Sequence, residues 1–290
     1  MKKLLSFILG VCLILPCAFL FTGCKDKPET KMETWDGTNI EVSAADSNGV
    51  ILIETAEELA GLAKEVNEGN DFAGKTIRLT CDMDLANKEW TPIGYGCSSI
   101  ADVAYSGYRF KGSFDGQNFK IYNLKITTFL DGDVAEGVGL FGHISGATIE
   151  NVKINTANVI GNHFVGALVG HATGSTINNC SVENVSVVCN FANEDASGDK
   201  AGALLGLIQA GYGMNSNLTN CSAYNSTVSA DRDAARIAGG AITHSRITDA
   251  VTTYSNLNSD ETVVVSYNAT GAGVGEDTNT NIKNENIARV

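Results

Sequence analysis

Two short motifs that recur in a common register constrain the fold of this chain more than any other feature. Six-residue segments centred on an asparagine occur four times, the first three at intervals of 28 residues, with the asparagines at Asn123, Asn151, Asn179 and Asn220. A four-residue segment that begins with glycine or alanine and ends with glycine keeps step with them, at residues 139–142, 167–170 and 203–206. Two patterns that agree in register indicate repeated structural units.

The asparagine segments predict stacked coils of short strands. Apolar residues stand two before, one after and three after each asparagine, so the alternation typical of a strand shifts by one position there. Asparagine tolerates the left-handed backbone that a one-residue corner between two strands requires. Such a unit cannot bury its apolar face alone, but successive units can stack with parallel strands. We therefore predict an all-β parallel β-helix (solenoid), whose four asparagines form a structural ladder spaced by about 4.8 Å.

A β-sandwich of short antiparallel strands is the competing fold. Sandwiches also show regularly spaced turns, but they have no reason to repeat the same asparagine and glycine registers. The repeats are expected to span residues 109–268, and a polar C-terminal tail is expected at 269–290.

Residues 50–108 predict an N-terminal cap and the first coil. Val50–Ile53 is a short apolar strand, and Thr55 with Glu58 forms a capping box that opens a helix. The apolar residues that follow lie on one face of this helix, at Leu59, Leu62, Ala63 and Val66. This helix is therefore expected to cover something apolar.

The N-terminus predicts export and lipid attachment. Lys2 and Lys3 precede an apolar run that ends in Phe21-Thr22-Gly23-Cys24, which resembles the lipobox of bacterial lipoproteins although Phe21 replaces the usual leucine. We predict a signal peptide at 1–23, lipidation at Cys24, a flexible tether at 24–49, and an extracytoplasmic lipoprotein anchored at the cell surface. An uncleaved anchor is less favoured, because the run barely reaches the ~20 residues of a spanning helix.

Charge and cysteine spacing exclude several classes of partner. The formal charge is -13, and it becomes -15 when Lys2 and Lys3 are removed, which argues against nucleic acid. Five further cysteines follow Cys24 without any closely spaced pair, so no metal site is expected and buried free thiols are the better expectation. No cofactor is predicted.

The order of several motifs resembles the GLUG family of bacterial surface proteins. Gly139-Leu140-Phe141-Gly142 is the complete copy of its motif, and it follows Thr55-Ala56-Glu57-Glu58-Leu59, Trp90-Thr91-Pro92-Ile93-Gly94 and Phe110-Lys111-Gly112-Ser113-Phe114-Asp115-Gly116 in the order that the family shows. The resemblance covers roughly residues 50–245 and implies a right-handed β-helix with an N-terminal capping α-helix. For function it implies surface display, often with adhesion or carbohydrate contact.

Candidate catalytic groups are sparse. A polysaccharide lyase or glycoside hydrolase would need carboxylates that converge on a groove, and Asp82, Asp84 and Asp115 qualify by residue type although two of them suit turns. Asp131, Asp133 and Glu136 lack the full calcium-loop pattern. His143 and His171 are 28 residues apart and are expected to stack on one outward face, without the neighbours that glycoside hydrolysis requires.

Insertions are the better place to expect ligand binding, because rigid scaffolds commonly carry recognition on loops. The possible ligand-binding aromatic residues are Trp90, Tyr105, Tyr108, Phe191 and Tyr212. The alternative is that these aromatic residues pack against the cap and the insertions are merely tolerated. The sequence thus predicts a non-catalytic, lipid-anchored surface protein that binds a glycan or a host or matrix protein. A polysaccharide-active enzyme is the alternative.

Overall fold

The computed structural model describes residues 32–95, 108–127, 137–190, 200–230, 233–242, 251–259, 263–267 and 287–289. The chain divides into a unit of Met1–Thr30 and a unit of Lys31–Val290, and every described residue belongs to the second. The predicted signal peptide and Cys24 lie outside the described residues.

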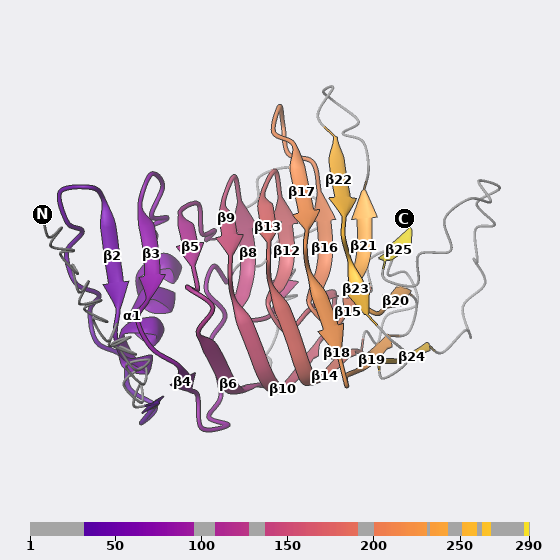
Figure 1. The fold of residues 1–290 in the computed structure, drawn as a ribbon, viewed down its shortest axis with the longest axis horizontal. Helices are drawn as coiled ribbons and strands as arrows, with labels where there is room; N and C mark the ends of the chain where they lie inside the picture. Colours follow the sequence, from indigo (N-terminus) through magenta and orange to yellow (C-terminus); the bar gives the residue numbers. More distant parts are fainter. Residues whose placement is uncertain are drawn as a thin grey trace, which may run out of the picture. The chain divides into compact units, whose positions relative to one another are not determined.

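The described strands form four sheets, which we number I to IV in the order that one complete coil passes through them (Figure 1). Sheet I contains β2 (Val50–Ile53), β3 (Thr76–Leu79), β5 (Ser113–Asp115), β9 (Thr148–Glu150), β13 (Thr176–Asn178), β17 (Ser216–Thr219) and β22 (Thr252–Ser255). Sheet II contains β1 (Glu33–Thr34), β4 (Met83–Asp84), β6 (Lys120–Ile126), β10 (Lys153–Gly161), β14 (Ser181–Cys189), β18 (Ser222–Tyr224), β19 (Thr227–Ala230), β23 (Asn258–Ser259) and β24 (Val264–Tyr267).

The two remaining sheets are smaller. Sheet III contains β7 (Gly137–Val138), β11 (Phe164–Val165), β15 (Lys200–Gly202) and β20 (Asp233–Ala235). Sheet IV contains β8 (Phe141–Ser145), β12 (Val169–Thr173), β16 (Leu205–Gln209), β21 (Ala238–Ile242) and β25 (Ile287–Arg289).

Each complete coil passes through all four sheets and then returns to sheet I beside its starting strand. The strands β9, β10, β11 and β12 form one coil, and β13 pairs with β9 in parallel to begin the next. Pairing between neighbouring named strands is parallel in all four sheets. The predicted parallel β-helix is confirmed, and the described residues contain one short helix, near the N-terminal region.

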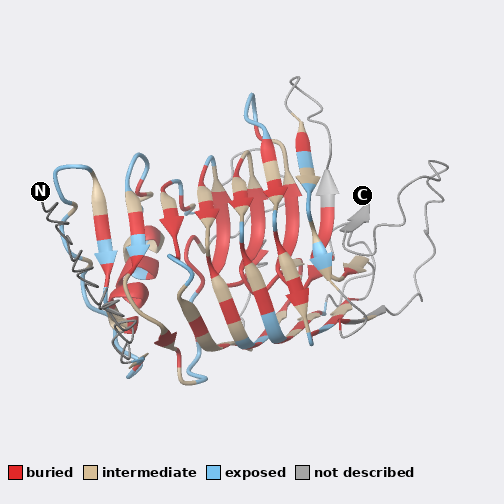
Figure 2. Ribbon diagram, viewed as in Figure 1, coloured by how far each residue is buried: buried red, intermediate tan, exposed pale blue. Residues whose placement is uncertain are grey.

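The core is built from columns of stacked apolar side chains. Figure 2 shows buried residues in every sheet of the ribbon. The inward column of sheet I consists of Ile51, Ile77, Phe114, Ile149, Ile177 and Leu218. Phe114 packs edge-on against Phe141 of sheet IV, with ring centroids 5.1 Å apart. Full burial of a side chain of this size contributes about 1.5–3 kcal/mol, so the columns supply the main force that holds the coils together.

Helix α1 (Ala56–Asn67) follows β2 and has the predicted capping box. The Thr55 side chain accepts from the Glu58 backbone N–H, and the Glu58 carboxylate accepts from Thr55 in return. The predicted apolar face of the helix is buried. At its other end, the Asn67 amide bonds Pro92 O at 3.0 Å and the Tyr95 N–H at 2.7 Å, which ties α1 to the next coil.

Two of the predicted flanking segments contain paired strands. The tether at 24–49 is not flexible throughout, because β1 pairs with β4 and Trp35 is buried against Trp90 at a centroid distance of 5.5 Å. Apolar surface on this segment is what fastens it to the fold. Within the predicted tail at 269–290, β25 pairs with β21.

All four predicted corner asparagines have a left-handed backbone, but they belong to two columns rather than one. Asn151, Asn179 and Asn220 have φ values of 57°, 53° and 56° and stand between sheets I and II. Asn123, with φ 57°, lies within β6 and aligns with Thr156 and Asn184, where sheet II bends. Both places need a left-handed residue flanked by alternating apolar residues, so the two motifs look alike in sequence.

The corner column is joined by side-chain amides. Asn179 Nδ2 donates to Asn151 Oδ1 at 2.7 Å, and Asn256 Nδ2 donates to Asn220 Oδ1 at 3.0 Å. Asn220 does not bond to Asn179 in the same way, because its Nδ2 donates to Oδ1 of the preceding residue, Asn178, at 2.8 Å. These amides lie at the surface of the corner, not inside the solenoid.

Replacing Asn151 with Leu is expected to lower the free energy of unfolding by about 1–3 kcal/mol, since a leucine resists the left-handed backbone and offers no amide. Chemical denaturation measures this loss. Asn151→Gly is the matched control, because glycine keeps the backbone conformation and removes only the amide bonds. If the Leu variant were as stable as the Gly variant, the left-handed corner would contribute nothing.

The second repeated motif places glycine where two sheets approach closely. A Cβ atom on Gly170 of β12 would lie 2.1 Å from the Val138 backbone nitrogen and 2.5 Å from Gly137 Cα. On Gly206 of β16, one coil later, a Cβ would lie 2.4 Å from the Val165 backbone nitrogen. The last glycine of the second and third motifs therefore lets sheet IV contact sheet III of the preceding coil without an intervening side chain.

Cysteines of the described coils are free thiols, as expected from their spacing. Cys180, Cys189 and Cys221 are buried, while Cys81 is partly exposed. Burial raises the pKa of the Cys180 thiol well above its usual value, so this sulfur stays protonated and behaves as a small apolar side chain.

Candidate functional site

The predicted aromatic residues do not gather into one site. Trp90 is only 3% exposed, and its indole N–H donates to Leu140 O at 3.2 Å, so it belongs to the core and is not available to a ligand. Tyr108 and Tyr212 are exposed, at 48% and 77%. Tyr105 and Phe191 lie outside the described residues.

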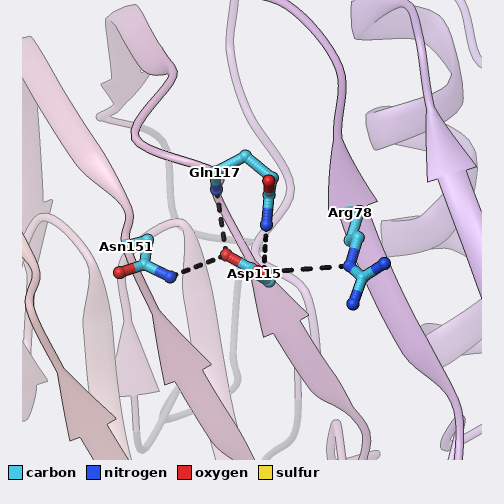
Figure 3. A network of polar contacts seen from close by, with 4 residues as sticks. All are labelled: Arg78, Asp115, Gln117 and Asn151. Atoms are coloured by element: carbon cyan, nitrogen blue, oxygen red, sulfur yellow. Dashed lines mark hydrogen bonds and ion pairs between the residues drawn. The ribbon is translucent and has the colours of Figure 1, made fainter.

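Asp115 is the most buried of the candidate carboxylates, and its oxygens are occupied by structural partners (Figure 3). Its Oδ1 accepts from the Gln117 backbone N–H at 3.0 Å and from Asn151 Nδ2 at 2.8 Å. Its Oδ2 accepts from Gln117 Nε2 and lies 3.8 Å from Arg78 Nε. Asp115 thus begins the corner column that continues at Asn151, so its carboxylate has a structural role.

Asp82 and Asp84 are also engaged by the backbone and the asparagines. Asp82 Oδ1 accepts from the Lys120 N–H at 2.8 Å, and Asp84 Oδ1 accepts from the Ala86 N–H and from Asn123 Nδ2, both at 2.7 Å. No hydrogen bond or ion pair joins these carboxylates to Asp115. Asp131, Asp133 and Glu136 lie outside the described residues.

His143 and His171 form a stacked pair on neighbouring strands of sheet IV, as their spacing predicts. Their ring centroids are 4.4 Å apart with 21° between the planes, and Thr173 Oγ1 lies 3.4 Å from one Nε2 and 3.3 Å from the other. Both rings are buried, contrary to an outward solvated position. His171 Nδ1 has no hydrogen-bond partner.

Burial governs the charge of this pair. It lowers the pKa of His171 to about 3, and the positive charge of Arg109 acts in the same direction. Burial also holds the pKa of His143 well below its usual value, and electrostatic repulsion from His171 and Arg109 lowers it further. Both imidazoles are therefore neutral at physiological pH and fill space between sheets. A proton donor in catalysis needs a pKa nearer neutrality.

An open groove crosses the outer face of sheet II. It encloses about 220 Å³ and is lined by Lys120, Lys153, Ile154, Asn155, Ser181, Val182, Glu183, Ser222 and Tyr224. These residues come from β6, β10, β14 and β18, which lie side by side in Figure 1. The groove therefore runs across the strands, along the direction in which the coils stack.

The polar lining of the groove forms two columns that the strand register places next to each other. One column consists of Lys120, Lys153, Ser181 and Ser222. The other consists of Tyr122, Asn155, Glu183 and Tyr224, of which the last three line the groove. Sequence reasoning missed this site because it aligned Asn123 with Asn151. An alignment of Lys120-Ile121 with Lys153-Ile154 would have brought out both columns.

In the described part of the chain, no cluster of three or more histidine, cysteine or acidic side chains could hold a metal ion. The same residues include no helix that is long and apolar enough to cross a membrane.

Comparisons with known proteins give no activity for this chain. No protein-family model and no curated protein matches the chain. A solved structure from Bacteroides ovatus, described as a "putative immunoglobulin A1 protease", is similar over 79% of this chain and 80% of its own, with 18% identity and a TM-score of 0.43. A likeness at this level says nothing about what this chain does, since one fold supports many functions.

Proposed function

We propose that this chain is a lipid-anchored surface protein of the GLUG type, which binds an extracellular ligand and does not transform it. The observation that carries the proposal is the open groove on sheet II, which spans four coils and combines lysine, tyrosine and amide side chains. Concave sites with a few well-placed polar groups are the usual binding sites of proteins.

The described acidic residues favour binding over catalysis. Asp82, Asp84 and Asp115 satisfy backbone and asparagine groups at successive coils. Hydrolysis of a glycoside usually needs two carboxylates within about 10 Å across a substrate cleft. The groove itself has one carboxylate, Glu183, which accepts from Asn155 Nδ2 at 3.0 Å.

Anchoring is tested at Cys24, which follows Thr22-Gly23 at the end of the apolar run. We expect the mature wild-type protein to carry fatty acid on Cys24 and to partition with membranes, whereas Cys24→Ala should be released from them. Mass spectrometry of the N-terminal peptide gives the direct measurement. Cys81→Ala is the control, because this thiol lies in the folded coils. A Cys24→Ala protein that is processed and still membrane-bound would contradict the anchor.

The absence of turnover is tested separately. The purified protein is incubated with a panel of acidic and neutral polysaccharides, and the length of each polymer is followed by size-exclusion chromatography. We expect no shortening. Shortening that disappears in Asp115→Asn or Glu183→Gln variants would establish a polysaccharide-active enzyme in place of the binding function.

A further inference from the structure

We infer that the groove on sheet II binds a linear acidic glycan, whose chain runs along the stack of coils and whose carboxylates contact Lys120 and Lys153. This inference names the ligand class for the proposed binding function and rests on it.

The two lysines are the first reason. They are direct neighbours in the ladder of β6 and β10, and like charges in that position destabilise a sheet. Neither ammonium forms an ion pair with a carboxylate in the described part of the chain, although Lys120 Nζ lies 5.9 Å from the centroid of the Tyr122 ring. Lys125 of the same strand, in contrast, pairs with Glu89 at 3.5 Å. An unneutralised pair of lysines within a groove suits an anionic ligand.

The net charge of the groove also favours a negatively charged ligand. Its lining contains two lysines and one glutamate, hence a net charge of +1, on a chain whose formal charge is -13. The one carboxylate of the lining bonds Asn155 Nδ2, and among the described residues no ion pair joins it to either lysine.

The direction of the groove favours a repeating polymer. Four strands at the usual spacing of about 4.8 Å present equivalent positions over roughly 14 Å. A linear glycan offers sugar units at a comparable repeat, and its ring faces can pack on tyrosine. Tyr224 is held in place for such contact, because Asn258 Nδ2 donates to its hydroxyl at 2.8 Å.

An extended peptide is less suitable for this groove. Peptides that add to a sheet need an open strand edge with free backbone groups. Here β10 and β14 are flanked on both sides by paired strands, so the groove offers side chains and no free edge.

The test uses the full chain in detergent and a fluorescent oligomer of α-1,4-linked galacturonic acid as the probe, with binding followed by anisotropy. The variants are Lys120→Ser and Lys153→Ser, since serine already occupies this column at Ser181 and Ser222 and does not threaten folding. We expect each variant to bind about tenfold more weakly, as the loss of one charge-assisted contact predicts, and we expect added salt to weaken the wild type. Lys125→Ser is the matched control and should change the affinity less than about twofold.

The outcomes separate this inference from the function that it deepens. Failure of the wild type to bind the acidic oligomer, or equal binding by Lys153→Ser, overturns the glycan inference. A neutral β-1,4-glucose oligomer or a matrix protein that binds in its place would leave the binding function standing. Shortening of the oligomer during the titration would overturn the proposed absence of catalysis and would leave the groove as the place of binding.

Discussion

Replacing Gly170 with Ala is expected to cost at least about 3 kcal/mol of unfolding free energy, or to prevent folding, although the change adds a single methyl group. The new Cβ would lie 2.1 Å from Val138 N and 2.4 Å from Gly137 C, and both are backbone atoms. Neither strand can retreat easily. β12 is paired on both sides in sheet IV, and β7 pairs with β11 and has both of its residues buried.

A matched control separates this steric effect from backbone strain. Gly74 has φ 73° and no atom within 4 Å of an added Cβ, so Gly74→Ala introduces strain without a clash. We expect it to cost about 1 kcal/mol. Gly170 lacks a positive φ, so its loss would be steric alone. Denaturation midpoints and soluble yields provide the comparison. If both alanine variants lost the same small amount, the close contact between sheets III and IV would not hold in solution.

Gly170 also shows why the fold could be predicted from the sequence. The second motif repeats because each coil has to bring two sheets into backbone contact at the same place, so its glycines mark a steric requirement of the solenoid. The asparagines repeat for an equally local reason, the left-handed backbone. Such requirements appear in one residue at a fixed position, and a single sequence is enough to reveal them.

The register between coils could not be read in the same way. Asn123 and Asn151 are 28 residues apart in the sequence, yet β6 and β10 pair Lys120 with Lys153, an offset of 33 residues. The coil that joins β6 to β10 is five residues longer than the regular repeat of 28. No local signal in the sequence says whether the extra residues come before or after the asparagine. The groove consists of side chains that the register between strands brings together. Aligning Asn123 with Asn151 gave the wrong register, so the groove could not be predicted from the sequence.

Trp90 illustrates a second limit. It stands in an irregular segment, and such segments are commonly exposed loops. In the structure, isolated β-bridges join Glu89 to Lys125 and Ile93 to Phe141, so the segment that contains Trp90 is attached to the next coil on both sides. The Trp90 ring packs inward against Trp35. Isolated bridges leave no periodic pattern in the sequence, which is why the sequence left both packing and ligand binding open for Trp90.

Mild acid is expected to destabilise the folded protein through the buried histidine pair. An unfolded histidine has a pKa of about 6.5, whereas burial lowers the pKa of His171 to about 3 in the fold. Below pH 6.5 the unfolded chain therefore binds protons that the folded chain does not, and stability falls as the pH decreases. For His171 alone the loss between pH 7 and pH 5 is about 2 kcal/mol, and the lowered pKa values of His143 and His163 act in the same direction.

The pH range isolates the histidines from the acidic groups. Asp36, Asp46 and Asp71 have pKa values lowered below their usual value near 4, so they remain charged down to pH 5. His171→Leu is the informative variant, because Leu207 occupies the same column one coil later and Gln209 Nε2 still lies 3.5 Å from Thr173 Oγ1. Unfolding free energies measured at pH 7, 6 and 5 should fall less steeply in this variant than in the wild type. Equal slopes would mean that His171 is protonated in the fold, and the stacked neutral pair would then be wrong.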